Sequence, residues 1–106
     1  MNGMIIVPLN KQGIKDYEED VTKTENLREF ELPEYEYLYL FKSGFFERLN
    51  QAFDLMIDEF ENEIIENVML AETRSILFEL EYYNAPVFLE ALDFAIEKGT
   101  EICLEL

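Results

Sequence analysis

The side chains that could do chemistry in this chain are almost all carboxylates. Its 106 residues include 24 Asp and Glu but only 8 Lys and Arg, and histidine is absent. Serine occurs only at Ser43 and Ser75, with no base other than a carboxylate to activate either hydroxyl. Cys103 has no histidine to pair with, which favours a small core or edge residue over a nucleophile. We therefore expect no enzyme activity and no cofactor.

Three carboxylates, Asp54, Asp58 and Glu61, recur about one turn apart in a segment with helical periodicity. Such a row could bind Ca²⁺ or Mg²⁺, but EF-hand sites use a loop with Asp at alternating positions, and no such loop is present. Zinc or copper would lack nitrogen and sulfur ligands. A solvated helix face is favoured and no metal is expected. A small carboxylate-based metal-binding domain or enzyme stays as an alternative, although 106 residues leave little room for a glycosidase-type cleft.

Net charge is the outlying property of the sequence, at −16. It is polarised along the chain, because residues 49–106 hold 14 acidic and only 2 basic residues. Like charges at this density repel one another, so the imbalance serves either solubility or the capture of a basic partner by electrostatic steering. Phosphate backbones and anionic membrane surfaces would be repelled. We expect no binding to nucleic acid or membranes.

The stretch EYEYLYLF, residues 34–41, places an aromatic residue at every second position. Strict alternation over residues 34–42 predicts a strand, with one face made by Tyr35, Tyr37, Tyr39 and Phe41. A base-stacking platform normally lies in a basic groove, whereas Glu34 and Glu36 flank these rings. The expected role is a sheet face, with Tyr39 and Phe41 in the core and Tyr35 at the rim.

Strands are expected at residues 4–9 and 100–106, where apolar residues run together or alternate. Two more are expected within residues 63–83, although the stretch IIENVMLAE, residues 64–72, also fits an extension of the preceding helix. In the middle region the expectation is a turn at residues 73–75 followed by a strand. Residues 10–33 read as irregular, with one or two short helices, and as the most mobile part.

Two main amphipathic helices are expected, at about residues 45–62 and 85–98. The first should turn Phe53 and Phe60 toward the core. Asn84 suits the N-cap of the second helix, with Pro86 in its first turn and Gly99 at its end. The fold class is α+β, a single domain spanning residues 1–106. Its four- to five-stranded, largely antiparallel or mixed sheet would have the helices on one face.

Localisation can be predicted from what the sequence contains. One cysteine cannot form an intramolecular disulfide, and the first eight residues lack a basic segment followed by a long apolar run. Apolar runs fall far short of the ~20 residues that a membrane span requires. These features favour the cytoplasm.

Two acidic patches compete as the expected partner-binding site. The favoured patch combines an N-terminal loop with the start of the tyrosine stretch: Asp16, Tyr17, Glu18, Glu19, Asp20, Glu34, Tyr35 and Glu36. In it, a flexible loop could reach into a concave partner, with Tyr17 as anchor. The rival patch is the helix row of Asp54, Asp58 and Glu61, whose rigid carboxylates would lose little entropy on binding.

The chain ends in FLEALDFAIEKGTEICLEL, residues 88–106, a predicted helix, a Gly-Thr stop and a last strand. A small acidic α+β chain with this ending resembles the immunity proteins of bacterial polymorphic-toxin and contact-dependent growth inhibition systems. That resemblance implies a cognate toxin as partner, often a cationic nuclease, whose active site the protein blocks. It also implies a monomer alone or a heterodimer with the toxin. The alternative is a nucleic-acid-mimicking inhibitor or regulator of another DNA- or RNA-binding protein.

Overall fold

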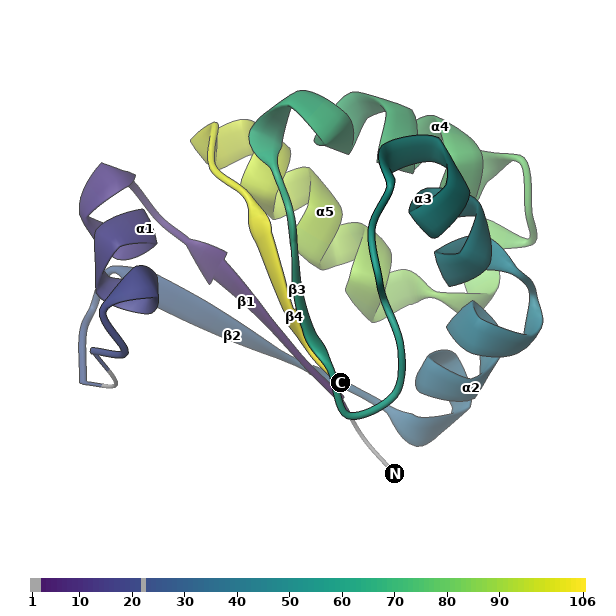
Figure 1. Ribbon diagram of the computed structural model, residues 1–106, viewed down its shortest axis with the longest axis horizontal. Coiled ribbons are helices and arrows are strands. Elements are labelled where there is room, and N and C mark those ends of the chain that lie inside the picture. Colours follow the sequence, from purple (N-terminus) through teal and green to yellow (C-terminus); the bar gives the residue numbers. More distant parts are fainter. Residues whose placement is uncertain (1–2, 22) are drawn as a thin grey trace.

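Four strands form one antiparallel sheet in the order β2-β1-β4-β3. The strands are β1 (Gly3–Pro8), β2 (Leu27–Leu32), β3 (Asn62–Ile65) and β4 (Ile102–Glu105). The structure, a computed structural model, describes residues 3–21 and 23–106 (Figure 1). The strands expected near the two ends of the sequence are confirmed, and so is the α+β class.

Five α-helices accompany the sheet: α1 (Lys11–Glu18), α2 (Glu34–Lys42), α3 (Phe45–Phe53), α4 (Leu70–Phe78) and α5 (Pro86–Lys98). Two 3₁₀ turns, η1 (Asn67–Met69) and η2 (Tyr82–Asn84), lie beside α4 in the chain. Helix α5 packs on β1, β2 and β4 and against α4, while α3 packs against both α2 and α4. Helices α2 and α3 reach the start of α5 through contacts with Phe88. Helix α1 lies on the other side of the strands, so the helices do not all share one face of the sheet (Figure 1).

The core lies between α5 and the sheet face turned toward it. Strand positions on that face are fully buried, and they are Ile5, Val7, Leu32, Ile102 and Leu104. They meet one side of α5, formed by Phe88, Ala91, Leu92 and Ala95. Because strand side chains alternate between faces, the intervening residues point to the opposite side of the sheet.

The strand expected at residues 34–42 is wrong, because this stretch is helix α2. Its buried residues are Glu36, Tyr37 and Leu40, which is the spacing of a helix face. Tyr35 is 62% exposed, which agrees with the rim position expected for it. Tyr39 and Phe41 were expected in the core but are only half-buried. The alternation of Tyr with Glu and Leu fits a strand, but Tyr37, Leu40 and Phe41 fit a helix equally well. Packing against α3 and α5 decides between the two.

Helix α3 is half as long as the 45–62 segment expected from periodicity, since it ends at Phe53. Asp54 follows in a left-handed conformation, with φ of 56°. The chain then forms a loop that the Asn50 side chain holds by accepting from the Ile57 N–H and donating to the Ile57 carbonyl. Phe53 is half-buried, but Phe60 is 72% exposed, so its inward placement is wrong.

The region of residues 63–83 contains one strand, β3, and not two. Residues 70–78, expected to contain a turn and the start of a second strand, form α4, and the Thr73 hydroxyl donates to the carbonyl of Met69 one turn back. Gly99 ends α5 in a left-handed conformation and Pro86 opens it, as expected. The Asn84 cap is wrong, since Ala85 is the N-cap residue and no side chain of its own caps the helix.

Residues 10–33 are more regular than expected, because they hold both α1 and the edge strand β2. The side chain of Asn10 accepts from the backbone N–H of Gly13 and caps α1. Gly13 lies against Pro8 and the carbonyl of Asn26, where a Cβ atom would meet the backbone oxygen. This close approach seats α1 on the end of the β1–β2 pair.

Candidate functional site

The sheet face turned away from α5 carries a row of carboxylates. Its central strands place Met4 and Ile6 there, and the register sets Glu29 beside Ile6 and Glu105 beside Met4. We call this surface the acidic sheet face and define it by the carboxylates and the apolar and aromatic residues that line its two hollows: Met4, Ile6, Tyr17, Glu18, Asp20, Val21, Leu27, Glu29, Glu63, Ile64 and Glu105.

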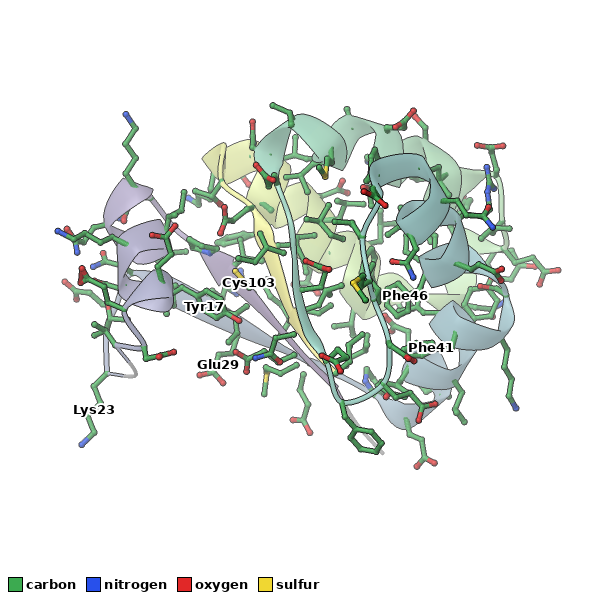
Figure 2. All side chains as sticks on the ribbon, in the orientation of Figure 1. Tyr17, Lys23, Glu29, Phe41, Phe46 and Cys103 are labelled. Atoms are coloured by element: carbon green, nitrogen blue, oxygen red, sulfur yellow. The ribbon has the colours of Figure 1, made fainter. Side chains whose placement is uncertain are left out.

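Two hollows of about 300 Å³ and 370 Å³ lie side by side on the acidic sheet face, and Tyr17, Asp20 and Glu105 line both. No Lys or Arg is among the described residues that line either one. Figure 2 shows Tyr17 and Glu29 beside the strands, whereas Lys23 is directed away from them. The surface therefore combines an apolar floor with carboxylates, and no cationic side chain lies among its described lining residues.

Tyr17 joins α1 to the sheet. Its hydroxyl donates to Glu105 Oε2 at 2.9 Å, across 88 residues of sequence. Burial raises the pKa of Tyr17, and the hydrogen bond to Glu105 raises it further, so the hydroxyl stays protonated and keeps donating at physiological pH. Tyr17 thus fixes the position of one carboxylate on the acidic sheet face.

Asp16 has a structural role and does not face a partner. It is 7% exposed, and its carboxylate accepts from the side chains of Gln12, Thr24 and Asn26. These hydrogen bonds lower the pKa of Asp16 below its ordinary value of 3.8. The network ties the segment after α1 back to that helix and so positions Glu18 and Asp20. Glu19 is exposed but lines neither hollow.

The residues Glu34, Tyr35 and Glu36, expected to extend the N-terminal patch, lie on α2 on the far side of the sheet from α1 (Figure 1). Glu36 is fully buried and accepts from the backbone N–H groups of Val87 and Phe88. It caps α5 from another element and is inaccessible to a partner. The favoured patch is therefore divided between two separate parts of the molecule.

The rival patch of Asp54, Asp58 and Glu61 is exposed, but it is not a helix row. All three residues follow the end of α3, and Asp58 and Glu61 border a separate hollow beside Met56 and Ile57. The backbone carbonyl of Glu61 accepts from the N–H of Leu106, which ties this loop to the end of β4.

Glu29 and Glu105 belong to the acidic sheet face but were not among the expected site residues. A signal for Glu105 is present in the sequence, where it alternates with the apolar residues Leu104 and Leu106. Glu29 could be placed only once residues 27–32 were recognised as a strand. Sheet pairing brings both residues to one face.

The single cysteine and the possible metal ligands are the remaining features of the described residues that could support chemistry. Cys103 is buried under the acidic sheet face, its thiol donates to Glu101 at 3.7 Å, and burial raises its pKa, so the thiolate is disfavoured. Among the described residues, no three His, Cys, Asp or Glu side chains are grouped so that they could hold a metal ion. None of the described helices has the length and hydropathy to cross a membrane.

Comparison with known proteins gives no relative: no family model, curated protein or solved structure matches the chain.

Proposed function

We propose that this protein is a non-catalytic acidic inhibitor that binds and neutralises a cationic protein through the acidic sheet face. In the most specific form of the proposal it is a cytoplasmic immunity protein that blocks the active site of a cognate toxin, such as a nuclease, in a one-to-one complex. The observation that carries the proposal is a rigid sheet face that presents carboxylates around an apolar floor and has no Lys or Arg among its described lining residues.

The distribution of arginine supports this choice of surface. All three arginines form ion pairs on the helical side of the molecule: Arg28 with Glu90, Arg48 with Glu79 and Arg74 with Asp93. Among the described residues, no Lys or Arg forms an ion pair with a carboxylate of the acidic sheet face. A chain of net charge −16 therefore uses its guanidinium groups elsewhere and leaves this negative surface available to an external cation.

Rigidity also favours the sheet over the loop of the rival patch. Glu29 and Glu105 stand on paired strands, and Glu105 is held by Tyr17. Carboxylates that are already positioned lose little conformational entropy when a partner binds. A nuclease active site is built to hold phosphate groups, so Lys and Arg side chains there would accept carboxylates in their place.

The test begins with a tagged copy of the protein, used to isolate its partner from the strain that produces it. Association with that purified partner is then followed by stopped flow for two double variants of equal charge change. Glu18→Lys with Glu29→Lys alters the acidic sheet face, and Glu72→Lys with Glu97→Lys alters exposed positions on the helical side.

We expect the sheet-face variant to slow association about tenfold or more, and the matched control to slow it much less. Raising the ionic strength should slow the wild-type protein and reduce the difference, because salt screens exposed charges beyond ~8 Å under physiological conditions. Equal effects of the two variants, or an on-rate indifferent to salt, would refute the proposal. A toxin whose activity persists in the saturated complex would refute the immunity function alone.

A further inference from the structure

A second exposed surface, made mostly of aromatic rings, lies at the end of the molecule opposite α1 (Figure 1). We call it the tyrosine surface and define it by Tyr39 of α2, Phe78 at the end of α4, Glu81, and the η2 residues Tyr82 and Tyr83. The rings of Phe78 and Tyr82 are 4.2 Å apart between centroids, and those of Tyr82 and Tyr83 are 6.0 Å apart. Tyr83 is 67% exposed, so a continuous row of rings faces solvent.

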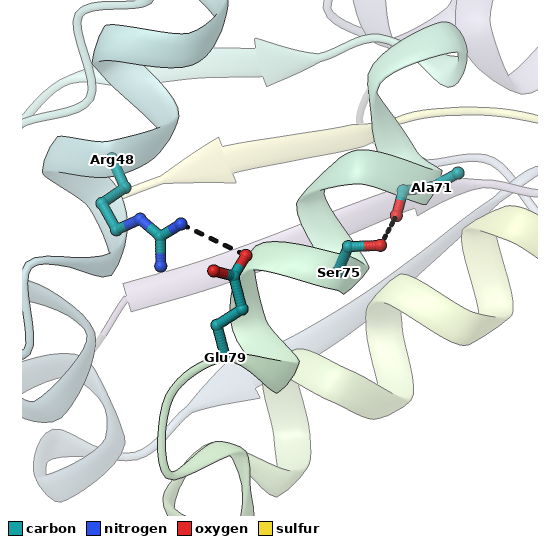
Figure 3. Close-up of polar contacts among 4 residues, drawn as sticks. All are labelled: Arg48, Ala71, Ser75 and Glu79. Carbon is teal, nitrogen blue, oxygen red and sulfur yellow. Dashed lines mark hydrogen bonds and ion pairs between the residues drawn. The ribbon is translucent and has the colours of Figure 1, made fainter.

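A hollow of about 530 Å³ adjoins these rings and is lined by Tyr39, Ser43, Leu80 and two carboxylates, Glu79 and Glu81. The two carboxylates differ in what they bind. Glu79 forms an ion pair with Arg48 at 3.2 Å (Figure 3). In the described part of the chain, the donors to the Glu81 carboxylate are neutral: the hydroxyl of Tyr83 at 3.1 Å and the side-chain amide of Asn84 at 3.3 Å.

At two other places in this protein, an arginine side chain contacts an aromatic ring and a carboxylate at the same time. Arg74 stacks over the ring of Phe78 at 4.5 Å and pairs with Asp93 at 2.7 Å. On the other side of α5, one guanidinium, that of Arg28, lies over the rings of both Phe30 and Phe94 and pairs with Glu90. In both places a guanidinium satisfies the π face of a ring and a carboxylate together.

For Tyr82, Tyr83 and Glu81, by contrast, no guanidinium in the described part of the chain lies over the rings or pairs with the carboxylate. We propose that the tyrosine surface is a docking site for an arginine-bearing segment of a partner protein. The guanidinium stacks on Tyr82 and Tyr83 and pairs with Glu81. Exposed aromatic groups of this kind are typical of interface anchors.

The negative charge of the protein favours an arginine-bearing segment over a second copy of the chain, nucleic acid or a lipid surface. A second copy of the chain brings another net charge of −16, and nucleic acid and anionic lipid are also negative, so each is repelled. Arginine is preferred over lysine because its planar group stacks on a ring while it forms paired hydrogen bonds with a carboxylate. The inference does not depend on the toxin-neutralising function, since it rests on different residues at a different end of the molecule.

The test uses the full chain, labelled for NMR, and two peptides of equal length and charge, one alternating Arg with Gly and the other Lys with Gly. Titrations are made at about 0.15 M salt to limit non-specific attraction. We expect the arginine peptide to shift the ring signals of Tyr39, Tyr82 and Tyr83 in a saturable manner. The lysine peptide should bind there about threefold more weakly or worse.

Three variants distinguish binding at the tyrosine surface from non-specific attraction of the peptide to the negatively charged protein. Tyr83→Leu and Glu81→Gln should each weaken arginine-peptide binding about threefold or more. Phe60→Leu is the matched control, because Phe60 is also an exposed ring flanked by carboxylates, and it should leave binding unchanged. Glu81→Gln removes a charge at an exposed position, so it tests the site even if loss of the Tyr83 ring disturbs η2.

Equal binding of the two peptides, or shifts confined to the acidic sheet face, would overturn the inference. So would an unchanged affinity in both Tyr83→Leu and Glu81→Gln. Self-association of the protein alone, measured by analytical ultracentrifugation and abolished by Tyr83→Leu, would assign the surface to a second copy and would also overturn it.

Discussion

Glu36 Oε2 lies 2.7 Å from the backbone nitrogen of Phe88, and the other carboxylate oxygen lies 3.1 Å from that of Val87. Pro86 precedes them and has no N–H to satisfy, so one side chain from α2 serves the next two backbone donors of α5. The negative charge also interacts favourably with the positive end of the helix dipole. A contact between residues 52 positions apart thus replaces the local cap that α5 lacks.

Replacement of Glu36 should therefore destabilise the whole fold. Glu36→Ala leaves two backbone donors unpaired in the interior, and we expect it to lower the free energy of unfolding by about 3 kcal/mol or more. Glu36→Gln keeps an acceptor and should cost less. Urea denaturation gives both values, with Glu97→Ala, at an exposed position of α5, as a control expected to change stability by less than about 0.5 kcal/mol. Comparable losses in Glu36→Ala and Glu97→Ala would rule out the capping role.

Stability should rise on mild acidification. Burial raises the pKa of Glu36 above 4.5, and burial likewise raises that of Glu101, whose neighbours Glu18 and Glu66 add to the effect. The folded state then binds protons that the unfolded chain has released, so the free energy of unfolding falls as the pH rises through these pKa values. Asp16 acts oppositely: its lowered pKa stabilises the fold above pH 3.8, and that contribution is lost as the pH falls further.

We therefore expect the melting temperature, followed by circular dichroism, to be higher near pH 5 than near pH 7 and to drop again in stronger acid, at about pH 3. Glu101→Gln should reduce the increase in melting temperature that accompanies acidification from about pH 7 to about pH 5. A melting temperature that increases steadily from about pH 5 to 8 would contradict the assignment of these raised pKa values.

Two phenylalanines on either side of the end of α3 should respond in opposite ways. Phe46 is fully packed against the rings of Phe41, Phe45 and Phe88, so Phe46→Ala should cost roughly 3–5 kcal/mol of unfolding free energy. Phe60 is exposed and has φ of 64°, a region that suits glycine, so Phe60→Gly should be neutral or stabilising. Chemical denaturation measures both, and a large loss of stability in Phe60→Gly would show that the loop packs differently.

The thiol of Cys103 should be inert in the folded protein. It is fully buried and its pKa is raised by burial and by the nearby carboxylates of Glu101 and Glu105, so little thiolate is present or accessible. A thiol reagent such as Ellman's should react slowly with the native chain near pH 8, and with one equivalent at once in guanidinium chloride. Rapid reaction in native buffer would require Cys103 to be exposed.

Several elements could be predicted from the sequence because their signals are local. The run Ile5–Val7 identifies β1, the alternation of Ile102, Leu104 and Leu106 identifies β4, and Pro86 and Gly99 mark the two ends of α5. Helix α2 was mistaken for a strand because Tyr and Glu alternate there. Which side of this helix becomes buried depends on tertiary contacts, with α3 next in the chain and with α5 more than 50 residues away.

The candidate site was recovered only in part, for the same reason. Tyr17, Glu18 and Asp20 reach the acidic sheet face, whereas Asp16 and Glu36 are buried and engaged in hydrogen bonds. The partners of Asp16 lie within ten residues of it, but those of Glu36 are more than 50 residues away. A carboxylate that caps a helix more than 50 residues away has no local signature. The end of α3 was missed because Asp54 adopts its left-handed conformation without a glycine to indicate it.

Strand order has a consequence for how the chain is made. Strand β4 lies between β1 and β3, and β3 has no other strand partner in the sheet. During synthesis β1 can pair with β2 early, but β3 must wait until residues 102–105 have left the ribosome. Closing a sheet across nearly the whole length of the sequence is slow compared with local pairing. The nascent chain therefore carries an incomplete sheet, with the helical core uncovered along one side, until residues 102–105 have emerged.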